Sequence, residues 1–227
     1  MRPNEIAKSK EYFYEKFSLP GVIACVDGTH VKILKPVVDE SVFLNRKGYY
    51  SLHTMIACNY NMEILAIDST HPGSCHDSFI WKSSEAREYF SRLNIPNSFV
   101  LADSAYTLEN FVLTPYRSPQ NGSTQHIFNK RHAAARNIVE RTIGLLKSRF
   151  RCLQGTLQYN PRFVCKLINV CCALHNMCRR RNIQIPGESE NSLEPINIET
   201  QDEVDADAMI ADGNSSAIRD AIASSLI

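Results

Sequence analysis

The chain has 227 residues with a formal net charge of +1, and 44% of its residues are apolar. This composition is typical of a globular protein, and the length is enough for one substantial domain with a tail, or for two small domains. No apolar run reaches the roughly 18 residues of a membrane-spanning helix, and the first residues lack the apolar core of a signal peptide. The eight cysteines are not spaced like a disulfide framework. We therefore interpret them as reduced thiols of a cytosolic or nuclear protein.

Charge is distributed unevenly along the chain. Residues 187–227 contain 10 acidic residues and 1 basic residue, which leaves 24 basic and 14 acidic residues in positions 1–186, a net charge of +10. A basic body is expected of a protein that binds a polyanion such as DNA. An ordinary solvated surface would give the same pattern, so charge alone leaves both interpretations open.

The first third of the chain predicts antiparallel strands. Residues 1–20 are polar with a weak helical pattern and are interpreted as an N-terminal segment. The apolar run that begins at Gly21 predicts a buried strand that ends at Asp27, followed by a turn and a second strand at residues 30–36. Two further strands are expected at residues 51–60 and 63–69, joined by a hairpin turn.

The rest of the chain predicts helices that alternate with short strands. Asp77 or Ser78 can cap a helix over residues 79–91, and a short buried strand at 98–102 ends before Asp103. The remaining expected elements are a helical turn at 108–111, a strand at 112–116, a long helix at 128–151, a helix that begins at Pro161, and a weak helix within 206–226. The acidic residues 183–227 have the composition of a disordered tail.

Three carboxylates fall where this arrangement can bring them together. Asp27 and Asp103 end buried strands, and Glu140 lies beside the apolar stripe of the long helix. Carboxylates that meet in a desolvated pocket repel one another unless a cation lies between them. Oxygen ligands of this kind suit Mg²⁺ or Mn²⁺, which promote phosphoryl transfer, often as a pair of ions. The element order also fits a ribonuclease-H-like core.

Several motifs together resemble one known family, the PIF/Harbinger transposases and the nuclease domesticated from them in animals. The motifs are Cys25-Val-Asp27-Gly-Thr-His30, Asn45-Arg-Lys-Gly-Tyr49, Pro72-Gly-Ser-Cys-His-Asp77-Ser78, Leu101-Ala-Asp103-Ser-Ala-Tyr106, Leu113-Thr-Pro-Tyr116, Phe128-Asn129 and Arg136-Asn-Ile-Val-Glu140-Arg-Thr-Ile-Gly-Leu-Leu-Lys147. Each motif alone is weak, whereas seven in the right order and spacing are specific. The resemblance covers residues 5–182.

The resemblance implies an α/β fold: an RNase H-like (DDE) mixed sheet flanked by helices, over residues 21–182. It implies Asp27, Asp103 and Glu140 as catalytic residues and as ligands of a divalent metal, Mg²⁺ or Mn²⁺. Asp77 corresponds to a further acidic position of the family's metal site, although it can instead cap the helix that follows it. Residues 1–20 precede this domain, and the tail of residues 183–227 follows it.

Basic residues near these motifs are candidates for binding DNA. Arg46 and Lys47, in a turn rich in tyrosine, can bind a phosphate backbone, or they can belong to a solvated turn. Around Glu140, Arg136, Arg141 and Lys147 can steer DNA towards the metal site, or they can neutralise the carboxylates. These two roles do not exclude each other.

The sequence therefore predicts a metal-dependent DNA endonuclease of Harbinger transposase origin. Two departures from the family matter: Ala105 stands where the family usually has glycine, and only 26 residues precede Asp27, where family members usually carry a longer region with a helix-turn-helix-like segment. We accordingly do not expect autonomous transposition. The alternative is a catalytically silent adaptor that binds DNA or protein and retains the transposase fold. The resemblance also implies a Myb-like DNA-binding partner and a location in the nucleus, with the cytoplasm as a second site.

Overall fold

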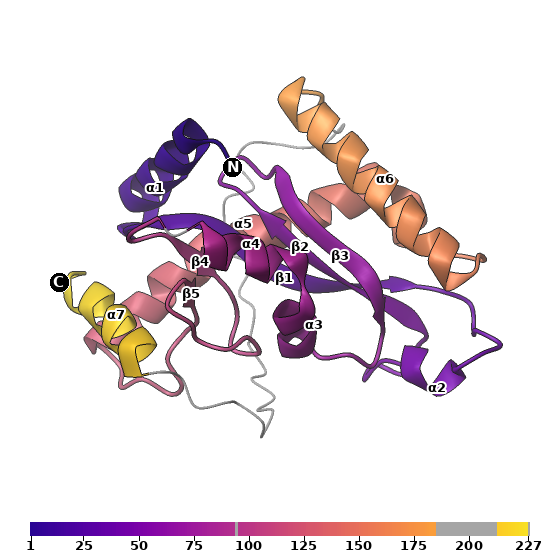
Figure 1. The fold of residues 1–227 in the computed structure, drawn as a ribbon, viewed down its shortest axis with the longest axis horizontal. Helices are drawn as coiled ribbons and strands as arrows, with labels where there is room; N and C mark the ends of the chain where they lie inside the picture. The colour runs from indigo at the N-terminus through magenta and orange to yellow at the C-terminus, as the bar shows by residue number, and fades with distance from the viewer. Residues whose placement is uncertain (94, 185–212, 227) are drawn as a thin grey trace.

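A computed structural model of the chain describes residues 1–93, 95–184 and 213–226 (Figure 1). The helices and strands are α1 (Pro3–Phe17), β1 (Val22–Lys32), α2 (Glu40–Phe43), β2 (Ser51–Cys58), β3 (Ile64–Pro72), α3 (Asp77–Ser83), α4 (Glu85–Arg92), β4 (Phe99–Leu101), β5 (Val112–Leu113), α5 (Thr124–Arg149), a 3₁₀ turn η1 (Arg151–Leu153), α6 (Pro161–Arg180) and α7 (Gly213–Ser224).

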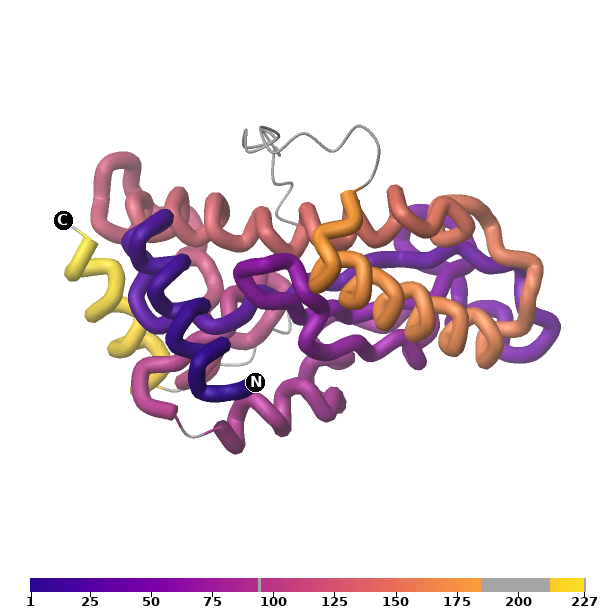
Figure 2. The backbone as a smooth tube through the Cα atoms, turned by 90° about the horizontal axis from the view of Figure 1, so that it is seen from above, coloured from indigo at the N-terminus to yellow at the C-terminus, as the bar shows by residue number. Residues whose placement is uncertain are grey.

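The strands form one mixed sheet in the order β3-β2-β1-β4-β5. The strands β1, β2 and β3 are antiparallel neighbours, whereas β4 and β5 run parallel to β1. Figure 2 shows α5 running along one side of the sheet, with α3 and α4 on the other. This arrangement confirms the predicted α/β fold with a mixed sheet flanked by helices, as in ribonuclease H.

Apolar side chains fill the space on both faces of the sheet. On one face, Phe13 of α1 and Phe128 and Val139 of α5 pack against β1, and all three are fully buried. On the opposite face, Trp81 of α3 and Phe90 of α4 cover β1 and β4. The helix α6 packs beside β3 in a third apolar cluster. The sheet is thus covered by helices on both faces.

Three local predictions were wrong. The turn expected after Asp27 does not form, because residues 25–32 pair continuously with β2 and make β1 a single strand of 11 residues. The helix expected over residues 79–91 is divided into α3 and α4 at Ser84, whose backbone is extended and whose hydroxyl accepts a hydrogen bond from the Arg87 amide. Residues 108–111 form a turn closed by a bridge between Glu109 and Val112, with no helix.

The expected weak helix near the C-terminus is present as α7. It packs on α5 and contributes Ile222 and Ala223 to the main core cluster. This end of the expected tail is therefore ordered, whereas residues 185–212 of the predicted disordered segment lie outside the described residues.

Two expectations from composition can be compared with the structure. All eight cysteines are free thiols, as the sequence predicts. Within the described ranges, no helix is both long enough and apolar enough to span a membrane.

Candidate active site: a carboxylate cluster beside the central strand

The pairing of β1 with β4 brings two predicted carboxylates to adjacent positions. Cys25 on β1 pairs with Leu101 on β4, in parallel register, and each aspartate follows two residues later as Asp27 and Asp103. The Asp103 Oδ1 atom accepts a hydrogen bond from the Ala105 amide at 3.0 Å. Ala105 is not among the described residues with positive φ, so alanine in place of the family's glycine causes no backbone strain.

Arg136 joins Asp27 to Glu140. Its Nη1 atom lies 3.0 Å from Asp27 Oδ2, and its Nη2 atom lies 2.6 Å from Glu140 Oε1. The side chains of Arg136, Asp27 and Glu140 are only 16%, 19% and 25% exposed. Arg136 and Glu140 are one helical turn apart on α5, which packs across β1. The three predicted catalytic carboxylates therefore lie in one region, with an arginine between two of them.

The pKa of Asp27 is raised by burial and by the acidic residues around it. Burial raises the pKa of Asp27 to about 7; Arg136 opposes this shift, while the negative charges of Asp103 and Asp77 add to it. The Gly28 amide donates a hydrogen bond to Asp27 Oδ1 at 2.9 Å, which also favours the carboxylate form. Arg136 and the Gly28 amide thus do not offset the combined effect of burial and the neighbouring acids.

Asp77 is held on the α3 side of the sheet. It is the first residue of α3, but His76 occupies the N-cap position and makes no side-chain capping bond. The Asp77 Oδ1 atom lies 3.1 Å from His53 Nε2 and accepts a hydrogen bond from the Tyr106 hydroxyl at 3.4 Å. Burial would raise the pKa of Asp77, but its contacts with His53 outweigh burial and the pKa is lowered. Asp77 is therefore an ionised partner of His53.

The pKa values of His53 and His30 shift in opposite directions although their rings stack at 4.4 Å. Both His53 ring nitrogens face acceptors, because Nδ1 lies 2.8 Å from the Cys75 carbonyl and Nε2 lies against Asp77. Burial lowers the pKa of His53. Its contacts with Asp77 and with the Cys75 carbonyl raise the pKa by more than burial lowers it, so the net shift is upward. For His30, burial and the neighbouring His53 lower the pKa to about 4. The surroundings thus favour the protonated form of His53, next to Asp77, and disfavour that of His30.

Gly28 leaves the space in which this contact forms. A Cβ atom at Gly28 would lie 2.0 Å from Asp77 Oδ1 and 2.5 Å from His53 Nε2. The sequence had indicated a turn glycine, whereas the structure places Gly28 inside β1 at a close approach between strand and helix. Sequence reasoning missed His53 and Tyr106 altogether, because neither residue shows its role until β2 and the loop after β4 are placed.

Two of the predicted DNA-binding residues, Lys47 and Lys147, lie near each other beside β1. Lys147 on α5 donates hydrogen bonds to Thr29 Oγ1 at 2.7 Å and to the His30 carbonyl at 3.0 Å. Burial, together with the nearby Lys47 and Lys32, lowers its pKa. Lys32 lies over the Tyr49 ring at 4.8 Å from its centroid. A basic cluster of Lys32, Lys47 and Lys147 therefore adjoins the carboxylates.

The other predicted DNA-binding residues have different surroundings. Arg46 is exposed in the turn before β2, and its Nη2 atom lies 2.6 Å from His76 Nδ1. Arg141 follows Glu140 on α5 and is half-buried. Arg136 is engaged with the carboxylates.

The carboxylates have the right chemistry for a divalent metal, but they are not gathered as a complete ligand set. Asp27, Asp103 and Glu140 offer the hard oxygen donors that Mg²⁺ and Mn²⁺ prefer. Among the described residues, however, no group of three or more histidine, cysteine, aspartate or glutamate side chains lies close enough to hold one ion. Arg136 instead binds oxygen atoms of two of the predicted ligands. The donor types fit the metal, and the side chains would have to rearrange to bind it.

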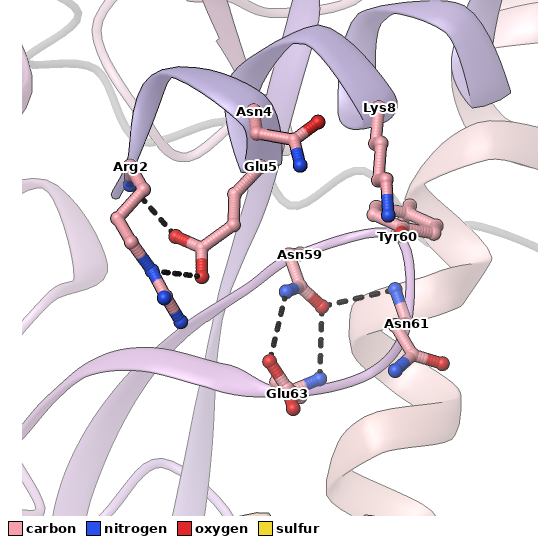
Figure 3. A pocket seen from close by; sticks show the side chains of 8 residues that line it. All are labelled: Arg2, Asn4, Glu5, Lys8, Asn59, Tyr60, Asn61 and Glu63. Atoms are coloured by element: carbon pink, nitrogen blue, oxygen red, sulfur yellow. Dashed lines mark hydrogen bonds and ion pairs between the residues drawn. The ribbon is translucent and has the colours of Figure 1, made fainter. Parts of the chain in front are cut away.

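A surface pocket lies apart from this cluster (Figure 3). It is lined by the first turns of α1 and by the turn between β2 and β3, and it contains none of the predicted site residues. Its polar groups bond to one another: Glu5 pairs with Arg2, and Asn59 bonds to Asn61 and Glu63. We assign no function to it.

Comparison with known proteins agrees with the motifs. Residues 26–176 match the protein family described as DDE superfamily endonuclease. The chain is 32% identical over 183 residues to a Rattus norvegicus protein named "Putative nuclease HARBI1", an alignment that covers 79% of this chain and 52% of that protein. The protein of the same name from Xenopus laevis is 33% identical over 190 residues, covering 82% and 54%.

A plant protein extends the comparison. "Protein ALP1-like" of Arabidopsis thaliana is 29% identical over 191 residues, covering 77% of this chain and 47% of that protein. The chain thus spans about half the length of the curated relatives that it matches. No solved structure matches the chain. The extent of the family match, together with the relatives named as nucleases, confirms the resemblance drawn from the motifs, and this chain belongs to the family of DDE superfamily endonucleases.

Proposed function

We propose that the chain is a divalent-metal-dependent DNA endonuclease that cleaves phosphodiester bonds by a two-metal DDE mechanism. The observation that carries the proposal is the placement of Asp27 and Asp103 at adjacent positions of parallel strands, with Glu140 linked to Asp27 through Arg136. Membership of the endonuclease family supports it.

In this proposal Asp27, Asp103 and Glu140 would hold the metal, Mg²⁺ or Mn²⁺, and Asp77 would support the site. When bound, such an ion lowers the pKa of water and stabilises negative charge on phosphate oxygens. The protein's own residues do the rest. His53 and Tyr106 fix the orientation of Asp77, and the basic cluster of Lys32, Lys47 and Lys147 would bind the DNA backbone.

A cleavage assay with Asp103→Asn tests the catalytic role. Supercoiled plasmid is incubated with the protein and either Mn²⁺ or Mg²⁺, and nicking is followed by gel electrophoresis. We expect wild-type nicking to require the metal and to fall at least about 100-fold in the variant, because loss of a metal-binding charge removes transition-state stabilisation.

The matched control is Asp39→Asn, which makes the same chemical change at an exposed position before α2. Asp39 has a positive φ of 53°, which asparagine also adopts readily. Nicking that persists in folded Asp103→Asn would contradict the proposal. DNA binding by a wild-type protein that never cleaves would favour the adaptor alternative.

The partner and the location are proposals from family resemblance. We propose a Myb-like DNA-binding partner and a nuclear location, with the cytoplasm as a second site. Fluorescent tagging in cells, with and without a coexpressed Myb-like protein from the same genome, tests both. A tagged chain whose location never changes with any such protein would argue against the partnership.

A further inference from the structure

We propose that Arg136 acts as an internal counter-cation: it occupies the carboxylate site in the metal-free protein and must release Asp27 or Glu140 before a divalent metal binds. This inference rests on the proposed metal site and deepens it. In this view, Arg136 on α5 controls the affinity of the site for metal.

Both carboxylate oxygens of Asp27 have a hydrogen-bond donor beside them. Arg136 binds Oδ2 at 3.0 Å, and the Gly28 amide donates to Oδ1 at 2.9 Å. The Gly28 amide belongs to the backbone of a strand paired with β2 and cannot turn away. Arg136 is a long side chain on the neighbouring helix α5, so its guanidinium can turn away from Asp27. Of the two groups that compete with a cation for Asp27, Arg136 is therefore the movable one.

The same guanidinium also engages Glu140. Because Nη1 and Nη2 bond to different carboxylates, one positive charge links β1 to α5. Planar arginine suits such a two-sided contact, and its charge persists at any pH that the protein tolerates. Removing it would leave Asp27 and Glu140 without the guanidinium that bonds to both of them. Arg136 therefore stabilises the metal-free fold.

A bound divalent metal reverses the role of Arg136. The ion would neutralise the same carboxylates, so a guanidinium left in place would repel it and withhold two donor oxygens. The contact of Arg136 with Asp27 and Glu140 therefore opposes the binding of metal. Because such coupling is reciprocal, Arg136 lowers the affinity of the site for metal.

Calorimetric titration of Mn²⁺ into wild type and Arg136→Gln tests the inference. We expect the variant to bind Mn²⁺ roughly 5- to 150-fold more tightly, the range typical of coupled sites. Without metal, we expect its melting temperature to be lower by at least about 3 °C, because the carboxylates are deprived of their counter-charge. Added Mn²⁺ should remove that difference.

The control is Arg87→Gln, which breaks an arginine–carboxylate pair with Glu109 at 2.7 Å, outside the cluster. Its Mn²⁺ affinity should equal that of the wild type. If Arg136→Gln does not fold, Arg136→Lys replaces it, because an ammonium cannot reproduce the two-sided contact. This variant should also bind Mn²⁺ more tightly than the wild type.

The outcomes separate the inference from the proposed function. Equal or weaker Mn²⁺ binding by the folded variant, with clear binding by the wild type, overturns the role of Arg136 and leaves the nuclease proposal standing. Binding by the variant alone supports the inference in its strongest form. Failure of both folded proteins to bind Mn²⁺ overturns the metal site and the inference together.

Discussion

At the scale of single residues, the protonation of Asp27 links the site to stability. Its pKa is about 7 in the folded protein and near 3.8 in an ordinary environment, so the folded state binds more protons between these values. The free energy of unfolding therefore falls as the pH rises from 4 towards 7, by roughly 1.4 kcal/mol for each pH unit, because the folded state loses its bound proton. Above pH 7 no further loss comes from this group.

Asp27→Asn should remove this dependence, because asparagine keeps the shape of the side chain and cannot ionise. The measurement is the free energy of unfolding in urea, in metal-free buffer, at several pH values between 4 and 8. The variant should gain stability relative to wild type as the pH rises, whereas Asp39→Asn should track the wild type. A constant difference between Asp27→Asn and wild type across this range would contradict the raised pKa.

Gly28 provides a second prediction at this scale. In Gly28→Ala the new methyl group would overlap Asp77 Oδ1 and His53 Nε2, so these two side chains would have to separate. Both are held by further bonds, to Tyr106 and to the Cys75 carbonyl, and we expect a cost of about 1–3 kcal/mol. The His53 proton resonance should also show a lower pKa in an NMR titration than in the wild type.

Gly144→Ala is the control for this change. Nothing lies within 4 Å of a Cβ atom at Gly144, which is on α5, so alanine should be neutral or slightly stabilising there. A Gly28→Ala protein with unchanged stability and an unchanged His53 titration would show that the strand and α3 adapt freely.

At the scale of elements, the sequence predicts best where its pattern is local. The apolar run before Asp27 and the long stripe of α5 were sufficient to place β1 and α5, and with them two of the carboxylates. The continuation of β1 past Gly28 depends on pairing with β2, which no local pattern encodes. The break at Ser84 depends on a capping bond within an otherwise helical segment.

The carboxylates of the candidate site could be predicted from the sequence, whereas their side-chain contacts could not. Reasoning about strand ends and helix faces predicted that Asp27, Asp103 and Glu140 converge. The structure brings the two aspartates together in another way, because Asp27 lies inside β1 while Asp103 follows the end of the parallel neighbour β4. The contact of Arg136 with Asp27, and that of His53 with Asp77, join residues more than 20 positions apart through side-chain geometry. Such contacts follow only from the packed fold.

The packing of α7 on the domain depends on Ile222. Ile222 is 8% exposed and packs in the main core cluster with α5. Ile222→Ala should therefore lower the free energy of unfolding by about 2–4 kcal/mol, as for other buried isoleucines. The control, Ala221→Ser, alters the exposed neighbour and should change it by less than about 0.5 kcal/mol. Equal values for the two variants in urea denaturation would mean that α7 does not pack on the domain in solution.

At the scale of the whole molecule, the basic cluster of Lys32, Lys47 and Lys147 lies beside the proposed active site. Residues 1–186 carry a net charge of +10. Burial lowers the pKa of Lys147, and the nearby Lys47 and Lys32 lower it further, so the three lysines lie close to one another. Lys147 is tied to β1 by two hydrogen bonds, whereas Lys32 and Lys47 are exposed. The two exposed lysines are therefore the ones free to meet a phosphate backbone beside the carboxylates.

Removal of both charges, in Lys32→Gln with Lys47→Gln, should weaken binding to duplex DNA by a similar factor for every sequence. Each lysine that no longer binds a phosphate reduces the slope of log affinity against log salt by about 0.9, so the slope of the double variant should be smaller by about 1.8. Fluorescence anisotropy in metal-free buffer at several salt concentrations measures it. Lys8→Gln changes an exposed lysine of α1 outside this cluster and should leave the slope unchanged. An equal change in both variants would mean that DNA responds to the overall charge of the body, and the cluster beside Asp27 would have no special role in binding.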